Sequence, residues 1–258
     1  PYCLRRTTIL GDYMLGIEAK KVTQILPEHL ILSKGITWIE GPGYFGKEMR
    51  FLAQETTAVL LSENKTVHWI DGAHRFNPST FFEPLRKRNC SLEEGLRRLY
   101  IGRGFTLHQL HALILRVHQE TVLTKASLVV VDGLLAMFLD EQIRRYEGRA
   151  ILRHCLHSLE KLSDQCPVIL IDGHASSRLH QQLKCTVKAH SSRHLLGYWK
   201  TSRKEILILR NTLDSETLLQ LLPKQIDESQ SRLEAFTSTG RVAQHQFLLV
   251  DSPSIQTE

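Results

Sequence analysis

Four apolar runs, each ending in an acidic residue, alternate with stretches of helical spacing, and this alternation constrains the fold more than any other feature. The runs are ITWIE (36–40), TVHWID (66–71), SLVVVD (127–132) and PVILID (167–172). A continuous apolar run is typical of a strand that is buried on both faces. Such strands separated by helices predict an α/β fold, with a mostly parallel central sheet covered by helices on both faces.

The segments between and after these runs predict the remaining elements. A helix is expected over 46–62, where apolar residues recur at helical spacing. Pro78 is expected to open another helix, in which Pro84 marks a break. The other expected elements are a strand over 98–102, helices over 106–123 and 148–165, a two-stranded hairpin over 195–211 and a short helix from 214 to 226.

Composition narrows the class of protein. The chain has 258 residues, enough for one large core, and no run of 18 or more apolar residues, which predicts no membrane span. Its five cysteines are scattered and odd in number, so we expect a cytoplasmic or nuclear protein of a reducing compartment, without a secretory signal. We expect an N-terminal extension (1–33), a core (34–211) and a C-terminal tail (212–258) that is partly helical or disordered.

The first apolar run leads into GPGYFGKEM (41–49), which nearly matches the phosphate-binding pattern G-x-x-x-x-G-K-[ST]. In such a loop, backbone N–H groups and a helix N-terminus hold phosphates, and the lysine reaches the outer ones. Glu48 replaces the hydroxyl that binds magnesium, so it could ligate the metal itself or repel the phosphates. Asp132, which ends SLVVVD, follows this loop at the distance in sequence expected of the second residue that binds the magnesium ion. The expected nucleotide-binding residues are Gly41, Gly43, Gly46, Lys47, Glu48 and Asp132, and ATP and magnesium are the cofactors that such a site would take.

Six segments in the same order resemble the RecA-like recombinase ATPases, specifically the RadA/RadB branch and its paralogs. The resemblance covers about 33–211 and leaves 212–258 unmatched. It implies a RecA-like P-loop core, DNA binding, and association with a recombinase or another paralog subunit. The segments are GITWIEGPGYFGKE (35–48), WIDGAHRFNPSTF (69–81), RLYIGRGFTLHQL (98–110), LVVVDGLLAMF (128–138), YEGRAILRHCLHSLEKLSDQ (146–165) and AHSSRHLLGYWKTSRKEILIL (189–209).

Departures from the family pattern predict weak or absent ATP hydrolysis. By the resemblance, the family's catalytic glutamate falls at Ala73, and the residue that senses the γ-phosphate falls near Gly173 or His174. A water-activating carboxylate and a metal-binding hydroxyl do separate work in phosphoryl transfer, so the loss of both removes much transition-state stabilisation. Asp71 and His74 are nearby groups that could substitute.

No acidic residue occurs from Gly173 to Lys204. The resemblance places the family's second DNA-binding loop in this basic stretch. Basic side chains track phosphates and aromatic rings stack on unpaired bases, although an ordinary solvated surface is the alternative. Single-stranded DNA is the expected ligand, and the expected DNA-binding residues are Arg178, Lys184, Lys188, Arg193, Trp199, Lys200, Arg203 and Lys204.

Thirteen histidines raise the question of a metal centre. The pairs His108/His111 and His154/His157 are spaced three residues apart on expected helices. No cysteine or carboxylate completes a ligand set at matching spacing, so we expect no metal site.

The sequence therefore favours a recombinase paralog that assists homologous recombination or DNA repair by binding DNA and a partner subunit, with degenerate ATP chemistry. Two alternatives stay open. One is an active P-loop ATPase or KaiC-like kinase that uses Glu48 or Asp71 in altered roles. The other is a structural adaptor whose basic stretch binds protein.

Overall fold

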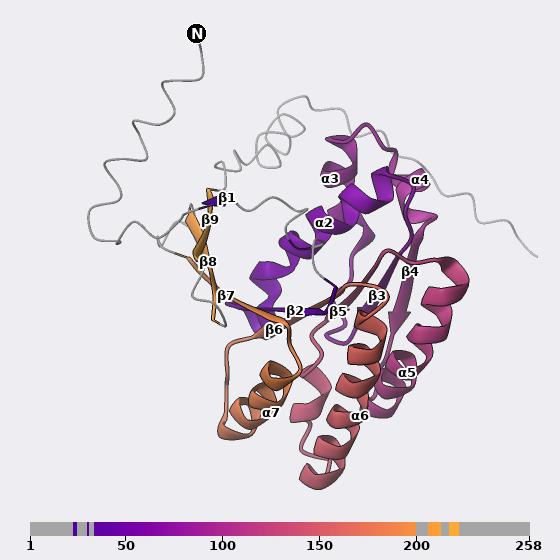
Figure 1. Ribbon diagram of the computed structural model, residues 1–258. Coiled ribbons are helices and arrows are strands. Elements are labelled where there is room, and N and C mark those ends of the chain that lie inside the picture. Colours follow the sequence, from indigo (N-terminus) through magenta and orange to yellow (C-terminus); the bar gives the residue numbers. More distant parts are fainter. Residues whose placement is uncertain (1–22, 25–29, 31–33, 200–205, 213–216, 222–258) are drawn as a thin grey trace, which may run out of the picture. The chain divides into compact units, whose positions relative to one another are not determined.

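The computed structural model describes residues 23–24, 30, 34–199, 206–212 and 217–221, and Figure 1 shows how their helices and strands are arranged. Nine strands form one sheet. They are β1 (Thr23–Gln24), β2 (Ile36–Gly41), β3 (Val67–Asp71), β4 (Leu99–Arg103), β5 (Leu128–Asp132), β6 (Val168–Gly173), β7 (Arg193–Trp199), β8 (Ile206–Asn211) and β9 (Thr217–Leu221). Their order across the sheet is β1-β9-β8-β7-β2-β6-β5-β3-β4.

Neighbouring strands from β7 through β4 in that order are all parallel, whereas β8 runs antiparallel to β7 and β9. The helices are α2 (Arg50–Ser62), α3 (Phe82–Arg86), α4 (Leu92–Leu96), α5 (Leu107–Thr124), α6 (Arg145–Ser163) and α7 (Arg178–Ala189). In Figure 1, α2, α3 and α4 lie on one face of the sheet and α5, α6 and α7 on the other. The predicted α/β fold with a mostly parallel sheet is confirmed, and the arrangement is compatible with a RecA-like core.

Alternate residues of the inner strands supply two apolar layers. Val129 and Val131 of β5 belong to the layer with α5, α6 and α7, whereas Leu128 and Val130 belong to the layer with α2. All four side chains are fully buried. Because both faces of β5 are covered, its sequence is an unbroken apolar run, which is why it could be predicted as a strand.

Helix α2 begins at Arg50, later than the sequence pattern indicated. The residues before it form a 3-10 turn, Tyr44–Met49, in which Phe45 and Gly46 have left-handed backbone angles, with φ of 44° and 71°. A left-handed residue interrupts a right-handed α-helix. Lys47 therefore lies in the turn and not in the first turn of α2.

Pro78 opens a helical segment as expected, a 3-10 turn over Pro78–Phe81. The Asn77 side chain caps it by accepting a hydrogen bond from the Ser79 amide. Pro84 lies near the start of α3, where a missing N–H removes no helical hydrogen bond. The expected break falls instead at the junction between the 3-10 turn and α3.

The basic stretch is more regular than expected. It contains α7, a helix of 12 residues, where the sequence predicted a DNA-binding loop. The Ser177 side chain caps α7 by accepting a hydrogen bond from the His180 amide, and Leu183 and Val187 bury one face of the helix. The prediction of a loop was wrong over 178–189, because capping and an apolar stripe at helical spacing stabilise a helix there.

The C-terminal part of the sheet gives one confirmation and one correction. The predicted hairpin is present as antiparallel β7 and β8, while the residues of its turn, 200–205, lie outside the described residues. The short helix expected over 214–226 is wrong at 217–221, which form β9. Pairing of β9 with β8 on one side and β1 on the other satisfies its backbone groups, so tertiary pairing overrides local helical propensity. No helix among the described residues is long and apolar enough to cross a membrane.

Candidate functional site

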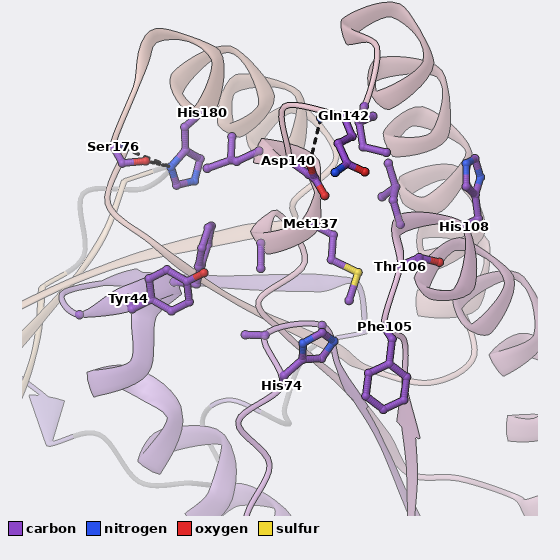
Figure 2. Close-up of a pocket in the computed structure, with 18 of the residues that line it drawn as sticks. Tyr44, His74, Phe105, Thr106, His108, Met137, Asp140, Gln142, Ser176 and His180 are labelled. Atoms are coloured by element: carbon purple, nitrogen blue, oxygen red, sulfur yellow. Dashed lines mark hydrogen bonds between the residues drawn. The ribbon is translucent and has the colours of Figure 1, made fainter.

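A cavity of about 780 Å³ opens at the carboxyl ends of the parallel strands. Segments that follow five different strands line it: 43–45 after β2, 72–74 after β3, 105–108 after β4, 136–143 after β5 and 174–180 after β6. Figure 2 shows Tyr44, His74, Phe105 and His180 around this hollow. Ligands of open α/β sheets bind at this edge, so the cavity is the candidate functional site.

The glycine-rich turn borders the cavity, but its carbonyl groups face a cation. The guanidinium group of Arg75 donates hydrogen bonds to the backbone oxygens of Tyr44 and Phe45. A phosphate-binding loop instead directs N–H groups at its ligand. The turn in this conformation therefore has the polarity of a cation site, and Arg75 fills it.

Arg75 also reaches Asp132, at the end of β5. Its Nε lies 3.0 Å from Oδ1 of Asp132, and its Nη2 donates to the same oxygen. Arg50, the first residue of α2, approaches the other carboxylate oxygen with its Nε at 2.7 Å from Oδ2. Asp132 is fully buried, and the side chains of Arg50 and Arg75 are only 9% and 11% exposed. Two guanidinium groups thus neutralise one buried carboxylate.

These contacts leave no suitable position for a magnesium ion or a nucleoside triphosphate. Both oxygens of Asp132 already bind guanidinium groups, so a divalent cation would meet two fixed positive charges. Glu48 accepts a hydrogen bond from the Trp199 indole N–H and so is turned toward β7. Lys47 is exposed and does not line the cavity. The six predicted nucleotide-binding residues share one edge of the sheet, but Lys47, Glu48 and Asp132 do not line its cavity.

The two groups considered as catalytic substitutes have structural partners. Asp71 is fully buried and accepts hydrogen bonds from the amides of Arg75 and Phe76 and from Nε of Arg103. It therefore fixes the turn after β3. His74 has a left-handed φ of 54°, and its Nε2 donates to the Gly104 carbonyl oxygen at 2.5 Å.

The end of β6 carries a third acid, Asp172. Its carboxylate accepts hydrogen bonds from the amides of Gly173, at 3.0 Å, and Leu135, at 3.2 Å. Complete burial raises the pKa of Asp172 to about 7, although those two hydrogen bonds partly oppose the rise. Asp172 ties β6 to the segment after β5 and does not line the cavity. His174, near which the resemblance places the phosphate-sensing residue, does line it.

Lys184 corrects the predicted DNA surface. It is 4% exposed, and its ammonium group donates to Glu40 and, at 3.1 Å, to the Gly173 carbonyl oxygen. Two histidines complete this Glu40 cluster: His174 Nδ1 at 3.2 Å and His194 Nε2 at 3.1 Å from the carboxylate. A buried, paired ammonium group cannot reach a DNA phosphate, so the assignment of Lys184 to DNA was wrong for this conformation.

The remaining predicted DNA-binding residues divide into three groups. Arg178 and Lys188 are exposed at opposite ends of α7, and Arg193 is half-buried at the start of β7. Trp199 is half-buried against the apolar layer beneath α2. Lys200, Arg203 and Lys204 lie outside the described residues.

The partners of Glu40 outweigh the effect of its burial on its pKa. Burial alone would raise the pKa of Glu40, but hydrogen bonds from His194 and Lys184, with the positive charge of Lys184, lower it to about 2. Among the described residues, no group of three or more histidine, cysteine, aspartate or glutamate side chains could hold a metal ion.

Sequence reasoning missed Arg50, Arg75 and Glu40, which decide the electrostatics of this edge. One signal was available. A buried acid at the end of a strand requires a cation, and without the magnesium-binding hydroxyl that cation is expected to be a basic side chain. Arg50 directly follows the glycine-rich segment, and Arg75 follows the second acidic strand end by four positions.

Comparison with protein-family models and with curated proteins finds no match to this chain.

Proposed function

We propose that this chain is a recombinase paralog that binds single-stranded DNA and a partner recombinase or paralog subunit, and that it does not hydrolyse ATP. The observation that carries the proposal is the double neutralisation of Asp132 by Arg50 and Arg75. It supports a P-loop core whose metal and phosphate positions have become internal ion pairs. The proposal of a recombinase paralog also depends on the sequence resemblance and on a fold compatible with a RecA-like core.

The same contacts weigh against an active ATPase or KaiC-like kinase. Phosphoryl transfer requires a metal ion and loop N–H groups around the phosphates. Here, Arg75 binds both the acid that would serve the metal and the loop carbonyl oxygens. Hydrolysis would require this arginine to leave two sets of partners at once.

DNA binding is supported by the charge of the basic stretch. Arg178 and Lys188 present exposed cations on α7, and Lys200, Arg203 and Lys204 add positive charge to the same acid-free segment. Phosphate contacts of this kind give sequence-independent binding that weakens steeply with salt. Lys184 is excluded from the proposed contact set because it is buried.

A partner subunit is supported by the open edge of the sheet. β4 pairs only with β3 among the described strands, and it exposes Tyr100 and Ile101, at 49% and 48%. Leu123 of α5, 83% exposed, borders the same surface as part of a second cavity. An unpaired edge beside apolar side chains can accept an extended segment of another chain, and we propose that the partner supplies it.

The experiment that tests the proposal combines DNA binding and ATP turnover. Fluorescence anisotropy with a short single strand across a salt series compares wild type with a variant carrying Arg178, Lys188, Lys200 and Arg203→Gln. We expect the variant to lose most of its affinity and its salt slope to flatten by about one unit for each phosphate that it no longer neutralises. ATP turnover by wild type is expected to equal that of Lys47→Ala.

A matched control removes the same charge elsewhere. The variant Lys65, Arg86, Lys87 and Arg97→Gln changes four exposed cations outside the basic stretch and should keep wild-type DNA affinity. Equal losses in both variants would show a general charge effect and contradict the assignment. Magnesium-dependent turnover above the Lys47→Ala level would contradict the absence of hydrolysis.

A further inference from the structure

The cavity at the carboxyl edge carries features that the phosphate chemistry does not use. Tyr44 and Phe105 are 70% and 68% exposed, although both are large aromatic residues. Each lines the cavity, and the His74 ring lies 5.2 Å from the Phe105 ring, centroid to centroid. Exposed aromatic rings at the rim of a cavity offer stacking surfaces for a flat ligand.

The interior of the cavity offers hydrogen bonding. His180 is 1% exposed, and its Nδ1 accepts a hydrogen bond from the Ser176 amide. Its proton therefore resides on Nε2, which has no hydrogen-bond partner among the described residues. Burial, and then the charge of Lys184, lower the pKa of His180, which keeps this ring neutral. A buried donor without a partner indicates a missing acceptor.

The cavity carries hydrogen-bonding side chains, and no lysine or arginine is among the described residues that line it. Asp140 is the one carboxylate among the lining residues, which also include His74, His108, His174 and His180. Arg178, exposed at the first turn of α7, lies two positions before His180 in the sequence. Ala73, where the resemblance places the family's glutamate, is also among the lining residues.

From these features we propose that the cavity binds a nucleobase, stacked on Tyr44 and Phe105, with a carbonyl of the base accepting from His180. The proposal deepens the proposed DNA-binding function and rests on it for the source of the base: an unpaired base of a single strand. A free nucleotide presents the same ring and phosphate chemistry, so the experiment distinguishes the two sources. A volume near 780 Å³ lies within the range of ligand pockets.

The test compares two strands of equal length by fluorescence anisotropy: an oligothymidylate, and a strand with the same phosphates whose bases are replaced by abasic sites. Wild type is expected to bind the oligothymidylate roughly tenfold more tightly, as stacking of one base predicts. The double variant Tyr44→Leu, Phe105→Leu should bring this ratio close to one while its affinity for the abasic strand stays unchanged. Both side chains are largely exposed, so the fold should tolerate the changes.

Phe82→Leu is the matched control, because Phe82 is 50% exposed and does not line the cavity. It should keep the wild-type ratio. A parallel titration with thymidine monophosphate, followed by NMR, tests the free nucleotide: binding that the double variant loses, with no preference between the strands, supports the cavity and assigns it to the free ligand.

Other outcomes overturn the inference. A wild-type ratio of one without thymidine monophosphate binding rejects the cavity site but leaves DNA binding standing. A preference, or nucleotide binding, that persists unchanged in the double variant rejects stacking on Tyr44 and Phe105. If wild type binds neither strand nor the free nucleotide, the cavity site and the proposed DNA-binding function fall together.

Discussion

Two buried carboxylates near the ends of parallel strands, Glu40 and Asp132, are neutralised in different ways. Glu40 binds Lys184 of α7, His194 of β7 and His174, which directly follows β6. Asp132 binds Arg50 and Arg75, and Arg75 also donates hydrogen bonds to carbonyl oxygens of the glycine-rich turn. A buried carboxylate needs cations in both cases. In the first the ion pairs join regular elements of the fold, whereas in the second they fix the shape of a loop.

The largest effect should be that of replacing Lys184, in contrast to the exposed Lys188 of the same helix. Lys184→Met leaves Glu40 without its ammonium partner and should lower the free energy of unfolding by about 3–5 kcal/mol. Lys188→Met, on the exposed side of α7, should change it by less than about 0.5 kcal/mol. Urea unfolding of both variants measures the difference, and similar small effects would show that Lys184 is not a core residue.

Glu40→Gln should destabilise the protein by about 3 kcal/mol at neutral pH, because it leaves Lys184 buried without a countercharge. The folded-state pKa of Glu40, about 2, is below its ordinary value of 4.5. Its stabilisation is therefore complete above pH 4.5 and is lost as the pH falls through 2. Urea unfolding at several pH values should show the advantage of wild type shrinking over that range, and a constant difference would contradict the assignment.

Arg75→Ala should lower the free energy of unfolding by about 2 kcal/mol, less than Lys184→Met, since Arg50 still neutralises Asp132. The main consequence should be local. Amide hydrogens of residues 43–49 should exchange faster in the variant, because Tyr44 and Phe45 lose the guanidinium that binds their carbonyl oxygens. Hydrogen exchange unchanged in that turn would show that Arg75 does not hold it.

The smallest effect should be that of Trp199→Phe. The change keeps most of the apolar packing against the layer beneath α2 and removes the hydrogen bond to Glu48, so it should cost about 1 kcal/mol of stability. Its affinity for single-stranded DNA should match wild type, since the ring packs within the protein. A clear loss of DNA affinity in anisotropy measurements would restore Trp199 as a stacking residue.

The sequence by itself determined strands β2 to β8 and helices α5 and α6, because burial on both faces and helical spacing are local signals. The run that forms β5 and the stretch that forms α5 were readable for this reason. The predicted parallel strands also imply that the acids ending them lie at one edge of the sheet, since parallel strands share that edge. The sequence could not show that β9 is a strand, because β9 depends on its neighbours β8 and β1.

Only the tertiary structure decided what the charged residues do. Glu40 and Lys184 are far apart in the chain, as are Arg75 and Asp132, and each pair meets because of the order of strands in the sheet. The glycine-rich turn looked like a phosphate site because its residue types match one. Its polarity was set by the direction of individual carbonyl groups and by the arginine that binds them, and no spacing of residues specifies either.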